Sequence, residues 1–311
     1  MKKTYPSLLL IIALLFNTTI KAQDPLELEE HWAQPNGLVN AIVKDSVNNI
    51  VYIGGNFTSI DPIEPHGTQI DATTGIPDFN FANPNNQVYA SEPDGNGGWY
   101  IGGEFTMVGD SVRNRIAHIT NTGEVSPLFS QNGFDASVNA LKLNGTQLYV
   151  GGNFTATGEF KEYGALLNNT DGQPISMFTE PNGAVHASVS DGSGGWYIGG
   201  DFTMVGDSAR NRIAHINNMG QVTAWNPNAN NRVRSLAVSG STVYAGGDFS
   251  TIGGQTKNRI AALDATTGLA TAWNPNANNS VRSLAISGNT VYVGGLFATI
   301  GGQSRNRIAA L

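Results

Sequence analysis

A Tyr-x-Gly-Gly-x-Phe motif occurs six times in this 311-residue chain. Its copies include "VYIGGNF" from Val51, "WYIGGDF" from Trp196 and "VYVGGLF" from Val291. So regular a motif is the signature of a repeat architecture, in which each copy folds as one small unit and stacks on its neighbours. The motif tyrosines are spaced 48, 49, 48, 47 and 48 residues apart, at Tyr52, Tyr100, Tyr149, Tyr197, Tyr244 and Tyr292.

Each copy divides into four short predicted strands. The first strand reads like "VRSLAV", and a tight turn such as Asn144-Gly145 joins it to the second strand, which carries the Tyr and Phe. The second strand leaves through a two-residue turn, Gly253-Gly254 in the fifth copy, where a positive φ suits glycine. The first strands are predicted to begin at Val39, Val88, Val138, Val185, Val233 and Val281.

The third and fourth strands complete the copy. The third ends in "RIAAL" or "RIAHI", and a loop such as "DATTG" leads into the fourth, because Asp opens and Gly closes a turn of this kind. Each fourth strand carries one aromatic residue that is predicted to pack between neighbouring sheets. These residues are Trp32, Phe81, Phe129, Phe178, Trp225 and Trp273.

The turn between the second and third strands also predicts a register. Counting outward from Gly253-Gly254 sets Asp248 opposite Arg259. The same count sets Glu104 opposite Arg115, and Asp201 opposite Arg212. We expect three cross-strand ion pairs, each contributing about 0.2–1 kcal/mol to stability.

Four strands in about 48 residues predict an all-β fold, a β-propeller of six four-stranded blades. A β-solenoid is the alternative architecture. "PLELEEHW", residues 25–32, would supply the sixth fourth strand and close the ring by pairing with the last first, second and third strands. The other interpretation is that the chain is a fragment of a seven- or eight-bladed propeller.

The N-terminus predicts export. Lys2 and Lys3 precede an apolar run that is too short to span a bilayer, so residues 1–22 are predicted to be a signal peptide and residues 23–311 a single propeller domain. Removing the signal leaves 24 acidic and 14 basic residues, a charge that disfavours nucleic acid as a partner. We expect a secreted, cell-surface or periplasmic monomer with no membrane span in the mature chain. The chain has no cysteine, which excludes disulfides and thiolate chemistry.

The repeat also resembles a known family. The string "WNPNANNSVRSLAISGNTVYVGGLFATIGGQSRNRIAAL" is similar to the delta-60 repeat, and the resemblance covers residues 26–311. It is weaker in the first copy, with "IDPIEPHGTQI", and in the third, with "ATGEFKEYGALL". The resemblance implies a β-propeller domain of exported bacterial proteins, with no catalytic residues to carry over.

The candidate binding residues are amides and bases that repeat near one face. In a propeller, the loop from the fourth strand to the next first strand and the turn after the second strand emerge together around the channel mouth. Amides donate and accept at once, which suits sugar hydroxyls or a peptide backbone, although Asn is also a good turn former. The candidates are Asn83, Asn85, Asn226, Asn228, Asn230, Asn274, Asn276 and Asn278 with Arg113, Arg210, Lys257 and Arg305.

Three functions follow from these patterns. The first is a non-catalytic binding or adhesion module for a glycan or protein ligand. The second is a polysaccharide hydrolase or lyase with acids at the channel mouth, for which the irregular copies offer His66, Glu159, Glu162 and Tyr163. The third is a structural scaffold in a larger surface protein. The five histidines lack metal-ligand spacing, so no metal or other cofactor is expected.

Overall fold

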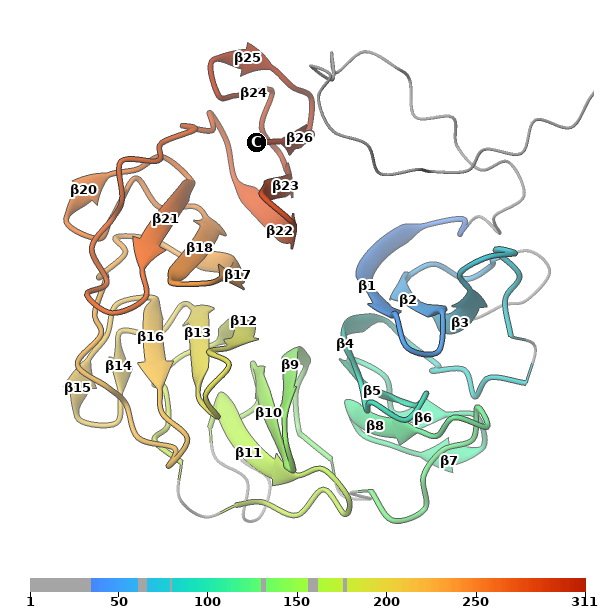
Figure 1. The fold of residues 1–311 in the computed structure, drawn as a ribbon. Helices are drawn as coiled ribbons and strands as arrows, with labels where there is room; N and C mark the ends of the chain where they lie inside the picture. Colours follow the sequence, from blue (N-terminus) through green and yellow to red (C-terminus); the bar gives the residue numbers. More distant parts are fainter. Residues whose placement is uncertain (1–34, 61–65, 79, 130–132, 156–161, 176–177) are drawn as a thin grey trace, which may run out of the picture.

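The computed structural model of the chain describes residues 35–60, 66–78, 80–129, 133–155, 162–175 and 178–311. The predicted signal peptide, the predicted closing strand at residues 25–32, His31 and Glu159 lie outside these residues. The described part is all-β, and it contains six three-stranded sheets. Figure 1 shows these sheets around a common centre, with the first and last sheets at the two ends of the arc.

Each sheet is one repeat, and its three strands are antiparallel neighbours. From the inner to the outer strand, the sheets are β1 (Leu38–Asp45), β2 (Ile50–Asn56) and β3 (Gly67–Asp71); β4 (Val88–Pro93), β5 (Trp99–Gly103) and β8 (Ile116–Ile119); β9 (Val138–Asn144), β10 (Gln147–Gly152) and β11 (Gly164–Asn168); β12 (Val185–Ser190), β13 (Trp196–Gly200) and β16 (Ile213–Ile216); β17 (Val233–Ser239), β18 (Thr242–Gly247) and β21 (Ile260–Asp264); β22 (Val281–Ser287), β23 (Thr290–Gly295) and β26 (Ile308–Ala310).

Four repeats add a two-stranded hairpin between the second and third strands of the sheet. In the fifth repeat Ile252 pairs with Gln255, and Gly253 and Gly254 have φ of 61° and 76°, so the predicted turn is confirmed. The hairpins are β6 (Met107–Val108) with β7 (Ser111–Val112), β14 (Met204–Val205) with β15 (Ser208–Ala209), β19 (Thr251–Ile252) with β20 (Gln255–Thr256), and β24 (Thr299–Ile300) with β25 (Gln303–Ser304).

The predicted fourth strand is wrong as a strand in the described repeats. Each fourth segment makes one isolated bridge to the third strand, for example Leu263 with Ala270. The third strand is short, and Lys257 Nζ takes two carbonyls of the segment, Thr271 O at 2.7 Å and Trp273 O at 3.0 Å. In the fifth repeat these carbonyls are therefore bound by a side chain, and the third strand and fourth segment form no longer hydrogen-bonded ladder.

The aromatic residues of the fourth segments do pack between sheets, as the repeat predicts. The Phe81 ring lies 5.7 Å from that of Tyr52, and both belong to a buried cluster that contains Trp99 of the next sheet. Trp225 packs edge-on against Tyr197 at 4.8 Å, in a cluster that continues into the fifth sheet. The core is thus a series of aromatic layers, one between each pair of blades.

The first glycine of each Gly-Gly doublet makes room for the next blade. A Cβ placed on Gly246 would lie 2.5 Å from Cγ1 of Val281, the first regular residue of the next inner strand. Gly54, Gly102, Gly151 and Gly199 meet the equivalent valine in the same way. Any side chain at these positions would push two blades apart.

The two end sheets leave this packing incomplete. The Cβ position of Gly294 meets only Ser283 within 4 Å, and Val39 is 41% exposed although its five counterparts are fully buried. Tyr292 is 47% exposed, whereas Tyr52 is fully buried. No strand pairing between described residues links the first sheet with the last.

We expect Gly246→Ala to lower the free energy of unfolding by about 1–3 kcal/mol, because the new methyl group overpacks the contact with Val281. In a Val281→Ala background the same change should cost much less, since the crowding methyl is gone. Urea unfolding of the four proteins of this cycle measures the coupling. Equal costs of Gly246→Ala in both backgrounds would contradict this packing.

Candidate functional site

Every inner strand carries a β-bulge at its second repeat position. In β12, Val185 pairs with Gly200 and Ala187 with Gly199, so His186 faces no partner residue. A bulge leaves one residue out of the ladder and redirects its side chain. The six residues, which we call the bulge ring, are Asn40, Tyr89, Asn139, His186, Arg234 and Arg282.

The second glycine of each doublet permits the bulge. A Cβ on Gly200 would collide with the carbonyl oxygen of Ala184, which instead accepts a 2.8 Å hydrogen bond from the N–H of Asp201. The backbones of the inner and middle strands approach closely at this point, and only glycine fits there. The Gly-Gly doublet thus has two separate roles, one between blades and one within a blade.

The bulge ring lines a central cavity of about 400 Å³. All six inner strands contribute to its wall, and all six bulge residues belong to it. Figure 1 shows the six inner strands around the common centre. The next position along each strand is Ala or Ser, which leaves the centre open. This volume lies within the roughly 300–1,000 Å³ of small-ligand pockets. The cavity is therefore the strongest candidate site in the described part of the chain.

Three bulge residues pair with the acid that follows the Gly-Gly doublet of their own blade. His186 Nε2 lies 2.9 Å from Asp201 Oδ2, and Arg234 Nη2 lies 2.8 Å from Asp248 Oδ2. Burial, and then Glu104, raise the pKa of Tyr89 to about 12, so its hydroxyl stays protonated. These contacts hold three side chains of the ring in place.

Asp201 and Asp248 are held in their ionised form. Burial alone would raise the pKa of Asp201, but hydrogen bonds from Arg232 and His186 outweigh it and lower the pKa below its ordinary value. The pKa of Asp248 is lowered in the same way, because the hydrogen bond and charge of Arg234, with the charge of Arg232, exceed the effect of burial. At neutral pH both groups are acceptors and not proton donors.

The predicted cross-strand ion pairs are wrong in the fourth and fifth blades. Asp248 pairs with Arg234, whereas Arg259 Nη1 donates to the carbonyl oxygen of Phe249 at 3.1 Å. Arg212 likewise donates to the Phe202 carbonyl at 3.2 Å. The reason is a left-handed backbone that turns the arginine away from the facing acid. Its φ is 68° at Arg115, 66° at Arg212, 67° at Arg259 and 69° at Arg307.

The structure brings the predicted loops and turns together at one end of the blades. Gly253 N–H donates to the Pro227 carbonyl at 2.7 Å, and Pro84 bridges Val108. The amide of Asn230 joins the two segments: its Oδ1 accepts the N–H groups of Ser250 and Thr251, at 2.9 and 3.1 Å. We call this side chain, which bonds the loop to the hairpin, the clamp. Its counterparts in the other blades are Asn36, Asn85, Asp135, Asn182 and Asn278.

Three of the candidate amides, Asn85, Asn230 and Asn278, are thus parts of the clamp. Asn228 and Asn276 adopt φ of 55° and accept 2.7 Å hydrogen bonds from Asn211 and Asn258. Asn226 and Asn274 are exposed, and Asn83 is half-buried. Asn226 and Asn274 belong neither to the clamp nor to these contacts between amides.

Three of the four predicted basic residues point inward. Arg113 Nη2 donates to the Ser126 carbonyl at 2.8 Å, and Arg210 donates to the Thr223 carbonyl in the equivalent place. Lys257 is only 3% exposed and holds the two carbonyls described above. Arg305 is exposed. The first three stabilise the fourth segments.

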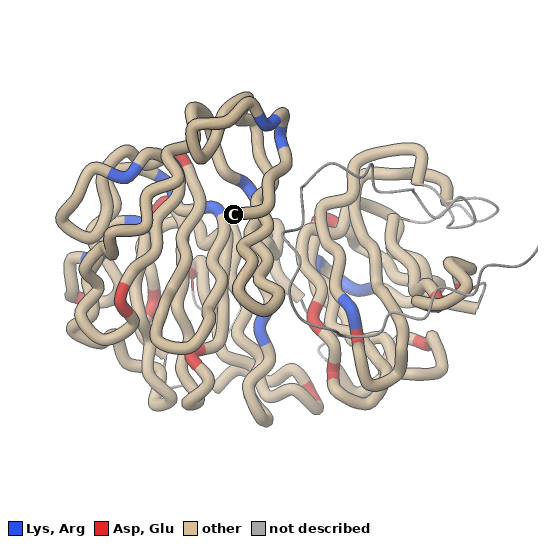
Figure 2. The backbone as a smooth tube through the Cα atoms, turned by 45° about the horizontal axis from the view of Figure 1, so that its top comes forward, with Lys and Arg blue, Asp and Glu red and all other residues tan. Residues whose placement is uncertain are grey.

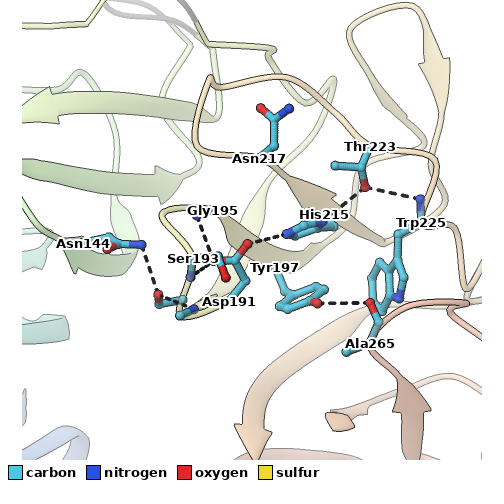
Figure 3. Close-up of polar contacts among 12 residues, drawn as sticks. Asn144, Asp191, Ser193, Gly195, Tyr197, His215, Asn217, Thr223, Trp225 and Ala265 are labelled. Carbon is cyan, nitrogen blue, oxygen red and sulfur yellow. Dashed lines mark hydrogen bonds and ion pairs between the residues drawn. The ribbon is translucent and has the colours of Figure 1, made fainter. Parts of the chain in front are cut away.

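A histidine–aspartate pair joins the turn that follows β12 to the third strand, β16 (Figure 3). Asp191 Oδ2 lies 2.9 Å from His215 Nε2, while Nδ1 of the same ring lies 3.2 Å from Thr223 Oγ1. Asp191 Oδ1 also accepts the N–H groups of Ser193 and Gly195, and so shapes the turn. The second blade repeats the pair as Asp94 and His118, at 2.9 Å. Because two blades share the pair, we interpret it as a structural contact that fixes the turn to the third strand.

Metal-ligand clusters, apolar helices and the charge distribution of the described residues point to no further site. Within them, no cluster of three or more His, Asp or Glu side chains could hold a metal ion. They also include no helix long and apolar enough to cross a membrane. Figure 2 shows acidic and basic residues scattered over the blades and not gathered on one outer face. His66, Glu162 and Tyr163 are described, but none of them lines the central cavity.

Comparison with known proteins supports the fold. The chain is similar to the WD40 β-propeller domain of Doa1, with TM-score 0.59 and 13% identity over 88% of this chain and 78% of that one. It is also similar to the computationally designed protein Ika8, with TM-score 0.58 and 16% identity over 84% of this chain and 69% of that one. No family model matches the sequence. No curated protein matches it either. The chain therefore has a propeller-like all-β fold.

We expect Asn230→Ala to lower the free energy of unfolding by about 1–2 kcal/mol, because it removes the hydrogen bonds that join a loop to a hairpin. Asn226→Ala is the matched control, an exposed amide in the same loop. Its stability should stay within about 0.5 kcal/mol of the wild type. Thermal and urea unfolding check both values. Equal effects of the two changes would contradict the structural role of the clamp.

We expect His186 to make stability depend on pH. Burial lowers its pKa below the ordinary value of 6.5, against the raising effect of Asp201. The unfolded chain therefore binds a proton at a pH where the folded protein does not, and the free energy of unfolding falls as the pH drops through about 6.5. Urea unfolding from pH 7.5 to 5.5 should show a shallower decline for His186→Gln. An unchanged slope would be contrary evidence.

Proposed function

We propose that the mature chain is an exported, non-catalytic binding module that takes a polar ligand in its central cavity. The observation that carries the proposal is the bulge ring. Six nearly identical repeats place six residues at one geometric position, and that position holds two amides, a phenol, an imidazole and two guanidinium groups. The supporting framework of Val, Gly-Gly and small residues hardly varies.

The chemistry of the ring suits a glycan. The amides of Asn40 and Asn139 make only long, 3.5 Å contacts, to the carbonyls of Val88 and Val185. They can therefore exchange these contacts for the hydroxyl groups of a sugar, since an amide both donates and accepts. The Ala and Ser residues that follow the bulge residues leave space for a sugar. The larger apolar residues of the wall are Ile42, Val43, Leu141 and Leu236.

The second candidate function is polysaccharide hydrolysis by the acids beside the ring. A glycosidase needs one carboxylic acid with a raised pKa that can protonate the leaving group. The pKa values of Asp201 and Asp248 lie below their ordinary range, and both carboxylates are already bound by basic side chains. This electrostatic arrangement favours binding over hydrolysis.

The place of action follows from the sequence patterns. We propose that residues 1–22 direct export and that the repeats belong to the delta-60 group, on the strength of the motifs "NPNANN" and "VGGLFATIGGQSRNRIAAL". The ligand would then be a glycan outside the inner membrane. The same residues would serve an adhesion protein, or a scaffold if no ligand exists.

We also propose that residues 25–32 supply the fourth strand of the last blade and close a six-bladed ring. The support is the uncovered apolar surface at both ends of the arc. Val39 is exposed although its five counterparts are buried, and Tyr292 is exposed although its counterparts are buried or, at Tyr244, half-buried. Closure would bring Val39 onto Gly294, as Val281 packs onto Gly246. A longer propeller of seven or eight blades is the alternative.

Closure makes a prediction about one glycine. If Val39 packs on Gly294, then Gly294→Ala should destabilise the mature protein by about 1–3 kcal/mol through overpacking. In an open arc the same change should be neutral or slightly stabilising, because alanine restricts the unfolded chain. Urea unfolding of residues 23–311 with and without the substitution distinguishes the two, and a neutral result would contradict closure.

The proposed function is tested by a glycan and peptide array probed with residues 23–311. We expect binding to glycans, and we expect Asn40→Ala with Asn139→Ala to weaken it at least about tenfold by removing two ligand contacts. Asn226→Ala with Asn274→Ala is the matched control on the outer loops and should bind like the wild type.

Three outcomes would contradict the proposal. Loss of binding only in the Asn226 and Asn274 variant would place the site on the outer loops. Cleavage of a polysaccharide probe would favour the hydrolase. Absence of binding to every probe by the folded protein would favour the scaffold.

A further inference from the structure

Arg282 differs from the other charged members of the bulge ring. In the fifth blade Arg234 pairs with Asp248, through Nε at 2.9 Å and Nη2 at 2.8 Å. The equivalent acid position in the sixth blade holds Leu296. Within the described residues, no acidic side chain pairs with Arg282. Its guanidinium therefore lines the cavity without the internal counter-ion that the repeat otherwise provides.

A guanidinium group that lines a cavity without a counter-ion can bind an anion. It stays protonated at any physiological pH and presents N–H donors in a fork that matches the two oxygens of a carboxylate. Arg282 is exposed, so a ligand can reach it.

We propose that Arg282 is a specificity-determining residue that binds the carboxylate of an acidic sugar. The inference rests on the proposed function and names its ligand class. A uronic acid combines the two features that the cavity can recognise: a carboxylate for Arg282, and hydroxyl groups for the amides of Asn40 and Asn139.

The fifth blade suggests the most informative substitution for testing Arg282. Leu296→Asp would recreate in the sixth blade the pair that Asp248 and Arg234 form in the fifth. The new carboxylate would occupy the guanidinium and exclude that of the ligand, while Arg282 itself remains. Arg282→Gln removes the charge directly, and Arg282→Lys keeps the charge but loses the fork.

The test is isothermal titration of residues 23–311 with two probes, a tetragalacturonate and its fully methyl-esterified counterpart. Esterification neutralises every carboxylate and adds one methyl group to each. We expect the wild type to bind the acid about tenfold or more tightly than the ester, because a charge-assisted hydrogen bond is lost in the ester. Arg282→Gln and Leu296→Asp should each reduce this preference below about threefold, and Arg282→Lys should keep part of it. Thermal unfolding verifies that each variant is folded.

The inference fails if the wild type binds both probes equally, or if Leu296→Asp leaves the preference unchanged. An array that shows binding only to neutral glycans would overturn the role of Arg282 and leave the proposed binding function intact. An array with no binder at all would overturn both.

Discussion

The packing of a valine from one inner strand onto a glycine of the preceding blade is the contact on which the rest of the structure depends. It recurs at five successive blade interfaces, and each glycine would collide with the valine if it carried a side chain. The contact sets how closely two sheets approach, and the aromatic residue of the fourth segment fills the space beside it. Repetition of one short contact therefore produces the curved array of Figure 1.

The second glycine of each doublet allows the candidate site to form. It lets the inner strand bulge, so that one residue of each blade leaves the ladder and lines the central cavity. The valines and glycines of this framework recur in the repeats, whereas the bulge position holds a different residue type in most blades, among them His186 and Arg234.

Much of this fold could be predicted from the sequence. The period, the turns at Gly145 and Gly253 and the interblade aromatic residues are local or periodic signals, and the structure agrees with them. Neither the fourth strand nor the ion pairs could be predicted correctly. In the fifth repeat the carbonyls of the fourth segment are bound by Lys257, and the ion pairs depend on the backbone geometry at a repeated arginine. A non-glycine residue such as Arg259 rarely adopts positive φ, and nothing in its sequence context announces the left-handed turn.

The candidate site was predicted only in outline. The loops and turns do meet at one end, but Asn230 is used internally and Lys257 is buried. The bulge ring was missed, because register counted from a turn assumes an unbroken ladder. The available signal was the second glycine of each doublet, since glycine inside a strand often marks a bulge.

The most direct test of the account asks whether the valine-on-glycine array closes around one cavity. The chain has no cysteine, so a cysteine pair can report proximity without interference. In the described interface between the fifth and sixth blades, Ser235 Oγ accepts the N–H of Leu284 at 2.9 Å, so Ser235→Cys with Leu284→Cys is the positive control. Ser283→Cys with Ile42→Cys is the equivalent pair across the two end sheets. A short bis-maleimide applied to residues 23–311 should cross-link both pairs within one chain if the blades form a closed ring. Cross-linking of the control pair alone would contradict closure.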